Sequence, residues 1–320
     1  MRGNAFVKMS ERKIVLGIDT SNYTTSLGVM FDDGELIANI KRPLPVKDGE
    51  RGLRQSDAVF NHVKNLPFVM DELRSVLDGG KISIVGVSTR PRNVEGSYMP
   101  CFLVGVGAAE TISATENIPI RYFSHQCGHV MAAIYSAGRN DLLDGRDFCA
   151  FHVSGGTTEM LRVRASDNGF TAELVGGSAD LNAGQVIDRV GVMMGLPFPA
   201  GPYIEALALE YSGKIPKKKP KINGFEVNLS GLENIALKMY QETEDKKLVS
   251  AFVLDYVGEA LSLLAEKYED TYGKTDFLFA GGVMSNSIIK NKLAKRYCAS
   301  FAEPKLSSDN AVGIAALCIK

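Results

Sequence analysis

The chain has 320 residues, 45% of them hydrophobic and 23% charged, with a formal net charge of −1. Its length favours two domains over one, and its near-neutral charge excludes a long-range attraction of the whole chain to nucleic acid. Five cysteines without CxxC spacing are typical of reduced cytosolic thiols, and neither a signal peptide nor a run of about 20 apolar residues is present. We therefore expect a cytoplasmic protein with no membrane partner.

The N-terminal part of the chain predicts an antiparallel meander followed by alternating helices and strands. Turn residues separate short apolar, β-branched runs, which is the pattern of β-hairpins, and an apolar period of 3.6 residues then indicates helix. We expect strands over 13–19, 25–31, 35–40 and 82–88, and helices over 56–77, interrupted near Pro67, and over 99–116.

A second strand–turn–strand unit follows over 148–153 and 159–163, and a late strand over 276–280 leads through Gly281-Gly282 into a helix over 285–296. This repeat is the layout of the actin, hexokinase and Hsp70 (ASKHA) superfamily. We therefore expect an α/β fold of two ribonuclease-H-like domains with an interdomain nucleotide cleft. The first domain is predicted over 1–124, with the last helix (about 306–320) packed back on it. The second, over 125–305, carries the glycine turns and a helical insertion.

Two glycine turns are candidate nucleotide contacts. Ser154-Gly155-Gly156-Thr157-Thr158 combines missing Cβ atoms with hydroxyl donors, which suits phosphate, although a plain hairpin turn has a similar composition. Gly281-Gly282 at the end of a strand suits an adenosine or its phosphates at a helix N-terminus. Neither a dinucleotide fingerprint nor a P-loop motif occurs in the sequence.

His125 and His129 are candidate metal ligands, since a helix places residues i and i+4 on one face, from which both imidazoles can turn toward one ion. The alternative is a pair of structural histidines. Asp309, before the last predicted helix, is either its N-cap or a third ligand. Two histidines and one carboxylate leave open positions and suit Fe(II) or Zn(II).

Two further features have alternative interpretations. Asp188 precedes a loop rich in proline and glycine and is either an acceptor for ribose hydroxyls or a surface acid. Lys217-Lys218-Lys219-Pro220-Lys221 predicts either a solvated loop or a local contact with RNA.

From Gly17-Ile18-Asp19-Thr20-Ser21 to Asp309-Asn310-Ala311, the motifs together resemble the catalytic subunits of tRNA threonylcarbamoyladenosine synthase, formerly called the O-sialoglycoprotein endopeptidase or glycoprotease family. The resemblance implies metal-dependent transfer of a threonylcarbamoyl group from threonylcarbamoyl-adenylate to N6 of adenosine 37 in ANN-decoding tRNAs. It also implies protein partner subunits of a tRNA-modification complex.

The same resemblance assigns residues to two sites. Fe²⁺ or Zn²⁺ is matched to His125, His129 and Asp309. The adenylate, or ATP or AMP in its place, is matched to Val153, Ser154, Gly155, Gly156, Thr157, Asp188, Gly201, Glu205 and Asn286.

The chain departs from the family pattern at several of these positions. Thr157 replaces the histidine of SGGHT, Asn22-Tyr23-Thr24 lacks the acidic pair of ETSCDET, Arg90-Pro91-Arg92-Asn93 replaces a GPG loop, and Glu233 replaces the lysine of SGLKT. The alternative prediction is thus a catalytically degenerate paralogue that binds ATP or AMP and metal and acts as a scaffold or regulator. A sugar or small-molecule kinase rests on fold analogy alone, and a protease is disfavoured because Gln126 stands where HExxH has glutamate.

Overall fold

The structure of the chain, a computed structural model, describes residues 12–21, 23–45, 53–166, 169–306 and 311–319. Contacts divide the chain into two compact units, one of residues 1–135, 166–172 and 309–320, the other of residues 136–165 and 173–308. The division follows Tyr135 rather than residue 124, because the helix that starts at His125 packs on the last helix. A Cβ at Gly313 would lie 1.8 Å from the Gly128 carbonyl oxygen, so the two backbones touch there.

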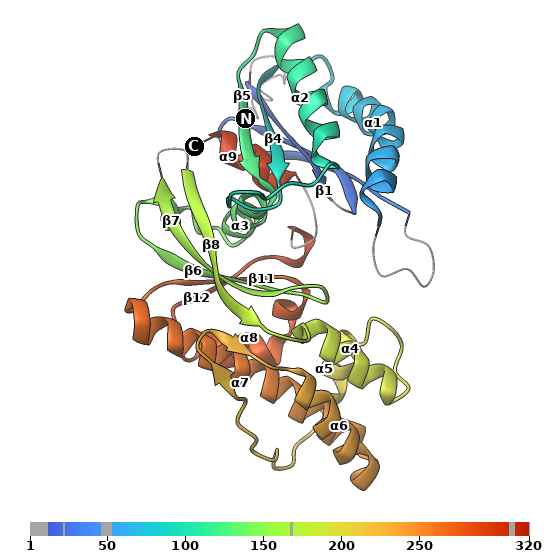
Figure 1. The fold of residues 1–320 in the computed structure, drawn as a ribbon, viewed down its shortest axis with the longest axis vertical. Coiled ribbons are helices and arrows are strands. Elements are labelled where there is room, and N and C mark those ends of the chain that lie inside the picture. The colour runs from blue at the N-terminus through green and yellow to red at the C-terminus, as the bar shows by residue number, and fades with distance from the viewer. Residues whose placement is uncertain (1–11, 22, 46–52, 167–168, 307–310, 320) are drawn as a thin grey trace, which may run out of the picture. The chain divides into compact units, whose positions relative to one another are not determined.

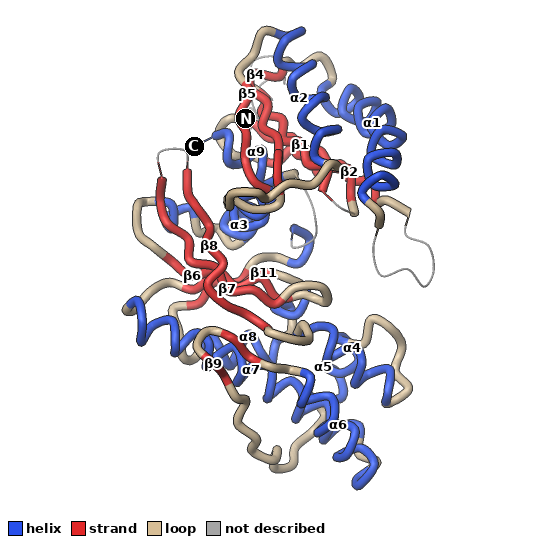
Figure 2. Tube along the Cα trace, viewed as in Figure 1, coloured by secondary structure: helices blue, strands red, loops and turns tan. Residues whose placement is uncertain are grey.

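The first unit is a sheet with helices on both faces (Figures 1 and 2). Its strand order is β3-β2-β1-β4-β5, with an antiparallel β1–β2–β3 meander and parallel β1–β4 and β4–β5 pairs. The elements are β1 Ile14–Ser21, β2 Thr24–Phe31, β3 Leu36–Pro43, α1 Gln55–Leu77, β4 Ile82–Arg90, α2 Phe102–Glu116, β5 Ile120–Ser124, α3 His125–Ser136 and α9 Val312–Ile319.

The two faces of this sheet differ because side chains alternate along a strand. Leu16 and Ile18 of β1 face α1 and α2, where they form an apolar core with residues such as Leu73. On the other face, a Cβ at Gly17 or Gly28 would lie 2.4–2.5 Å from the Ala311 carbonyl oxygen. Helix α9 therefore rests directly on the strand backbone.

The interruption predicted near Pro67 is wrong, because α1 continues through this residue. A proline leaves one carbonyl without its helical partner and normally bends or ends a helix. Pro67 lies on the exposed side of α1, where water can satisfy that carbonyl, while Val69 and Leu73 keep the next turns packed in the core.

The second unit repeats the same topology. Its sheet runs β12-β11-β6-β7-β8-β10-β9, so β8-β7-β6-β11-β12 matches the order of the first sheet and confirms the predicted repeat. The elements are η2 Asn140–Leu143, β6 Phe148–Val153, β7 Thr158–Ser166, β8 Gly169–Ser178, α4 Ala183–Met193, α5 Gly201–Leu209, β9 Ile222–Asn223, β10 Glu226–Val227, α6 Ser230–Thr243, α7 Lys246–Tyr272, β11 Phe277–Ala280, η3 Gly282–Ser285, α8 Ser287–Ala294, β12 Ala299–Phe301 and η4 Pro304–Leu306.

Helix α7 forms the centre of the second unit. It is the one helix of the described residues that is long and apolar enough to cross a membrane, but 83% of its apolar window is buried. Its side chains, among them Phe252 and Leu261, pack with β6 and β11 in the core. The burial identifies α7 as a core helix.

Candidate functional site

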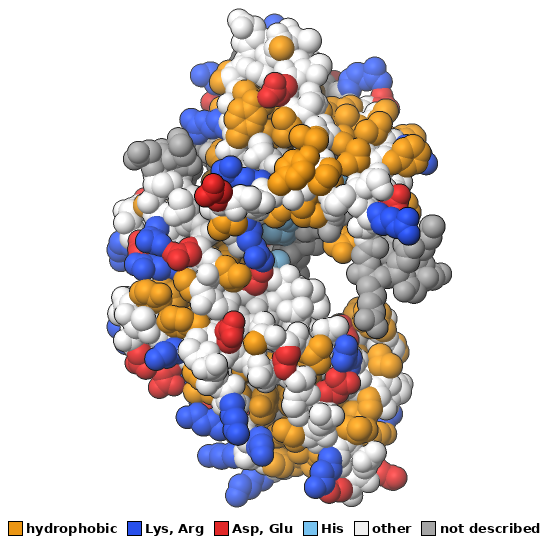
Figure 3. Space-filling view, viewed as in Figure 1, with side chains coloured by type: hydrophobic (Ala, Val, Ile, Leu, Met, Phe, Trp, Pro, Cys, Tyr) orange, Lys and Arg blue, Asp and Glu red, His pale blue; other side chains and the backbone are white. Residues whose placement is uncertain are grey.

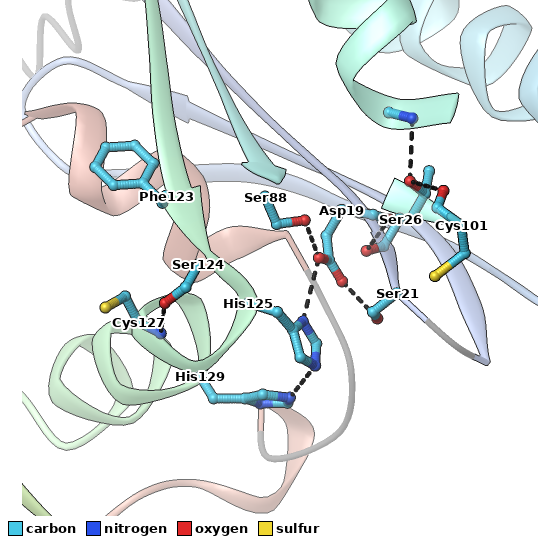
Figure 4. Close-up of polar contacts among 12 residues, drawn as sticks. Asp19, Ser21, Ser26, Ser88, Cys101, Phe123, Ser124, His125, Cys127 and His129 are labelled. Carbon is cyan, nitrogen blue, oxygen red and sulfur yellow. Dashed lines mark hydrogen bonds and ion pairs between the residues drawn. The ribbon is translucent and has the colours of Figure 1, made fainter. Parts of the chain in front are cut away.

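The two predicted metal ligands stand together at the start of α3. Strand β5 passes directly into this helix, and the Ser124 Oγ accepts a hydrogen bond from the Cys127 N–H at 3.2 Å. His125 and His129 lie one turn apart on the same face, as predicted, with their Nε2 atoms 2.9 Å apart (Figure 4). The two imidazoles therefore converge on one point.

Asp19, at the end of β1, fixes the orientation of His125. Its carboxylate is fully buried, with Oδ1 3.2 Å from His125 Nδ1 and also bonded by the Ser88 hydroxyl, while Oδ2 accepts from Ser21 Oγ at 2.7 Å. Burial raises the pKa of Asp19, but the charge and hydrogen bond of His125 and the two hydroxyls outweigh it and hold this pKa below its ordinary 3.8. When His125 is neutral, the ionised carboxylate accepts a hydrogen bond from Nδ1–H, and the Nε2 lone pair of His125 then faces His129.

The geometry of the histidine pair fits a shared metal ion. Two imidazole nitrogens at about 2.0–2.1 Å from one ion, with angles of about 90–110°, lie about 2.8–3.4 Å apart. The observed 2.9 Å falls in this range. No third histidine, cysteine or carboxylate joins the pair among the described residues, and Asp309 lies outside them. Its role as a ligand stays a prediction.

A buried histidine on α1 supports the turn that follows Asp19. His62 Nε2 lies 2.8 Å from the Ser21 carbonyl oxygen and therefore carries a proton, while Nδ1 lies 2.8 Å from Thr25 Oγ1 and accepts from it. Burial lowers the pKa of His62, although the bond to Ser21 and the charge of Asp19 oppose the shift. The first hairpin is thus held by a neutral imidazole.

Five of the nine predicted adenylate residues line one cavity of about 340 Å³ in the second unit, namely Gly155, Asp188, Gly201, Glu205 and Asn286. Gly282 lines the same cavity. A Cβ added at Gly155, Gly201 or Gly282 would meet no atom within 4 Å. The missing side chains leave space in the cavity rather than allow close packing. The predicted nucleotide site needs open space of this kind, and its occupant stays a prediction.

The polar residues of this cavity also position its walls. Asp188 Oδ1 accepts from the Ala200 N–H at 2.7 Å and so holds the loop before α5. Glu205 Oε1 accepts from the Ser287 N–H at 2.7 Å, and Asn286 Oδ1 caps α8 by accepting from the N–H groups of Ile288 and Ile289 at 3.1 Å. Asp188 lies inside α4, with one carboxylate oxygen already engaged.

The remaining four predicted residues are placed differently. Val153 is a buried strand residue, and Ser154 closes the turn through its N–H to the Thr157 carbonyl at 2.7 Å. Gly156 and Thr157 line another cavity, of about 320 Å³, which shares no lining residue with the first. The turn therefore contributes to two cavities.

Glu233, which replaces the family's lysine, does not line either cavity. It lies on α6, where its carboxylate pairs with Arg189 of α4 at 3.1 Å, and both side chains are partly exposed. This substitution changes a surface ion pair rather than the lining of the candidate nucleotide site.

A sequence model of the TsaD family, described as tRNA N6-adenosine threonylcarbamoyltransferase, matches residues 46–316. The chain belongs to this family. A relative in Methanopyrus kandleri, the "tRNA N6-adenosine threonylcarbamoyltransferase", is 29% identical over 311 residues that cover 94% of this chain and 86% of the relative. The family is thus one of transferases that act on tRNA.

A relative of this chain in Methanocaldococcus jannaschii is about twice the length of the matched region. This "Probable bifunctional tRNA threonylcarbamoyladenosine biosynthesis protein" is 25% identical over 280 residues, or 88% of this chain and 49% of the relative. Among solved structures, full-length HypF aligns with a TM-score of 0.58 and 11% identity, covering 96% of this chain and 55% of HypF. That likeness concerns the fold, and with the repeated strand order it confirms the predicted ASKHA architecture.

Proposed function

We propose that this chain transfers a threonylcarbamoyl group from threonylcarbamoyl-adenylate to N6 of adenosine 37 in ANN-decoding tRNAs. The observation that carries the proposal is the convergence of His125 and His129, backed by the buried carboxylate of Asp19, in a member of the TsaD family. A fixed tautomer and two nitrogens within ligand distance of one point are what a metal-dependent acyl transfer needs from the protein.

His125 and His129 would hold one Fe²⁺ or Zn²⁺, with Asp309 as the proposed third ligand. Such an ion, when bound, supplies Lewis-acid polarisation of the carbamoyl carbonyl. Asp19 keeps His125 in the tautomer whose Nε2 lone pair faces this position, and Ser21 and Ser88 hold Asp19. The protein's contribution is therefore orientation set before substrate arrives.

The adenylate, or ATP or AMP, is assigned to the cavity lined by Gly155, Gly201 and Gly282. The backbone N–H of Gly155 in this turn suits the phosphate, since the missing side chain lets an anion approach it closely. Asp188, Glu205 and Asn286 offer polar groups along the same lining. Because these glycines have no side chains, a nucleotide can occupy the space beside them.

Two surfaces support contact with macromolecules. The lysines of 217–221 are exposed in the loop between α5 and β9, and Figure 3 shows cations gathered at that end of the second unit, where the tRNA backbone would find charge complementarity. Hydrophobic side chains are exposed on α1 and α2, among them Phe60, Phe68 and Leu103, which suits a protein partner subunit (Figure 3).

One observation favours the alternative of a scaffold or regulator that binds nucleotide and metal without transfer. Thr157, at the family's histidine position, lines the cavity of about 320 Å³ and not the one that holds Gly155. The residue that departs from the family pattern therefore lines a different cavity from the five predicted adenylate residues that include Gly155.

The deciding experiment measures transfer of radiolabelled threonine from preformed threonylcarbamoyl-adenylate to unmodified ANN-decoding tRNA. Protein loaded with Fe²⁺ or Zn²⁺ is assayed with and without candidate partner subunits, and His125→Ala serves as the site variant. Incorporation that requires metal and is lost in the variant would establish the transferase.

Metal content, nucleotide affinity and thermal unfolding are measured on the same preparations. They separate loss of chemistry from loss of folding. If both ligands bind and no tRNA is modified under any condition, the transferase proposal fails and the scaffold is favoured.

A further inference from the structure

A third cavity, of about 190 Å³, lies in the first unit beside α3. Cys127 lines it, and on a helix this residue points about 200° away from His125. Figure 4 shows Cys127 and His125 on different sides of α3. The cavity is therefore separate from the proposed metal site, and none of the residues assigned to metal or adenylate lines it.

The floor of this cavity is apolar and fixed. Cys127, Phe170 and Leu317 line it and are each at most 5% exposed. The Cys127 thiol donates to the Phe170 carbonyl at 3.8 Å and accepts from Asn93 Nδ2 at 3.3 Å, so its polar capacity is used inside the wall. Ser124, Ser166 and Thr171 also line the cavity, so a ligand would meet carbon on the side of Phe170 and Leu317 and hydroxyl-bearing residues elsewhere.

The rim of the cavity carries one cation, Arg90, at the end of β4. Its Nε and one terminal nitrogen both lie 3.4 Å from Asn93 Oδ1, a long contact with a neutral group. Within the described part of the chain no carboxylate lies within 4.0 Å of this guanidinium. A guanidinium whose one partner among the described residues is a neutral amide is suited to a carboxylate, which accepts two parallel hydrogen bonds from it.

We propose that this cavity binds a small aliphatic carboxylate, with its carboxylate on Arg90 and its hydrocarbon chain on Phe170 and Leu317. The cavity volume is about six times the volume that one water molecule occupies in liquid water. The ligand is therefore limited to about the size of a four-carbon acid. The apolar side formed by Phe170 and Leu317 favours a carboxylate with a hydrocarbon chain over phosphate, and Arg90 disfavours an amine. Arg90 and Asn93 belong to the segment that replaces the family's GPG loop, so the site is a property of this chain.

The proposal does not depend on threonylcarbamoyl transfer, and binding alone tests it. Methyl-labelled protein is titrated with butyrate, with n-butylammonium and with inorganic phosphate, and the Leu317 methyl signals report occupancy of the floor. We expect saturable shifts of Leu317 with butyrate only. Shifts produced equally by phosphate or n-butylammonium, or no shift with butyrate, would overturn the assignment.

Three variants locate the charge that matters. Arg90→Gln is expected to weaken butyrate at least tenfold, and Arg90→Lys to weaken it less, because lysine keeps the charge but loses the fork. Arg92→Gln is the matched control, since it removes a cation from the same loop without lining the cavity. Equal weakening by Arg92→Gln and Arg90→Gln would show a general charge effect and overturn the site.

Discussion

The first hairpins of the two sheets occupy the same topological position but differ in burial and in hydrogen bonding. Around the β1–β2 turn, Asp19, Ser21 and Thr25 are buried and bonded to one another or to histidines. Around the β6–β7 turn, Gly155 and Gly156 are exposed and border cavities. The β1–β2 hairpin therefore has buried side chains that are hydrogen-bonded, whereas the β6–β7 hairpin has exposed backbone beside open cavities.

The two units share a strand order, but the residues at the corresponding turns differ and suit different roles. A buried carboxylate needs several hydrogen bonds to stay ionised, so the first hairpin is committed to holding His125. The second hairpin has glycine at 155 and 156, and the missing side chains leave the backbone there accessible, as the proposed phosphate contact requires. The variants below change the first hairpin or its support, the second hairpin or the helix packed on it, or the surface ion pair of Glu233.

The largest effect is expected from Asp19→Asn. An amide no longer fixes His125 in one tautomer, and loss of such an outer partner typically weakens metal binding about 10–100-fold. Competition with a chromophoric chelator measures the affinity. Asp33→Asn, an exposed acid in the β2–β3 turn, is the matched control, and equal affinities in both variants would contradict the role of Asp19.

The second hairpin is tested by Gly155→Ala. Its methyl group would enter the cavity without touching protein, so nucleotide affinity is expected to fall about tenfold, or about 1.4 kcal/mol, at unchanged stability. Gly107→Ala, also open at its Cβ, is the control.

Gly184→Ala completes the series, because its methyl would lie 2.7 Å from the Gly155 nitrogen. This contact is expected to reduce the free energy of unfolding by about 1–3 kcal/mol. Nucleotide titration and urea unfolding of the three variants distinguish the cases. Destabilisation by Gly155→Ala, or full affinity in it, would exclude the open cradle.

The support of the first hairpin is tested by the pH dependence of stability. His62 stays neutral in the fold because its pKa is below 6.5, whereas the unfolded chain binds a proton there. The free energy of unfolding therefore falls as pH decreases through about 6.5, by at most about 1.4 kcal/mol per pH unit for this group. Urea unfolding at pH 7, 6 and 5 is expected to show a flatter dependence in His62→Gln. An unchanged slope would assign the effect to other groups.

The smallest effect is expected from Glu233→Lys, which restores the family's residue. The exposed pair with Arg189 is worth at most about 1 kcal/mol, and neither cavity loses a lining residue. Nucleotide titration is expected to give the same affinity as the unchanged chain. A change of more than about threefold would place this position in electrostatic contact with the ligand.

The sequence predicted the architecture and the histidine pair because both depend on local patterns. Alternating apolar runs indicate strands wherever they occur, and residues four apart share a helix face in any helix. Asp19 was not assigned to His125, because the two are 106 positions apart and meet only through the parallel pairing of β1, β4 and β5. An acid that ends a fully buried strand was the available signal.

A single sequence also does not indicate which residues of a turn line which cavity. The resemblance grouped Gly155, Gly156 and Thr157 in one site, whereas the structure divides them between two cavities. That division depends on how α4 docks on the turn, through the Gly184 N–H to the Ser154 carbonyl. A contact of this kind has no local sequence signature.

Helix α9, which rests on the glycine face of β1 and β2, sets the order of events during synthesis. The first unit contains residues 1–135 but is completed only by residues 309–320. At about 5–20 residues per second, the ribosome needs about 10–40 s to make the 185 residues that follow Tyr135. Through that interval the backbone of β1 and β2 lacks its cover. We therefore expect the part of the protein that is made first to reach its native packing only after residues 309–320 have been made.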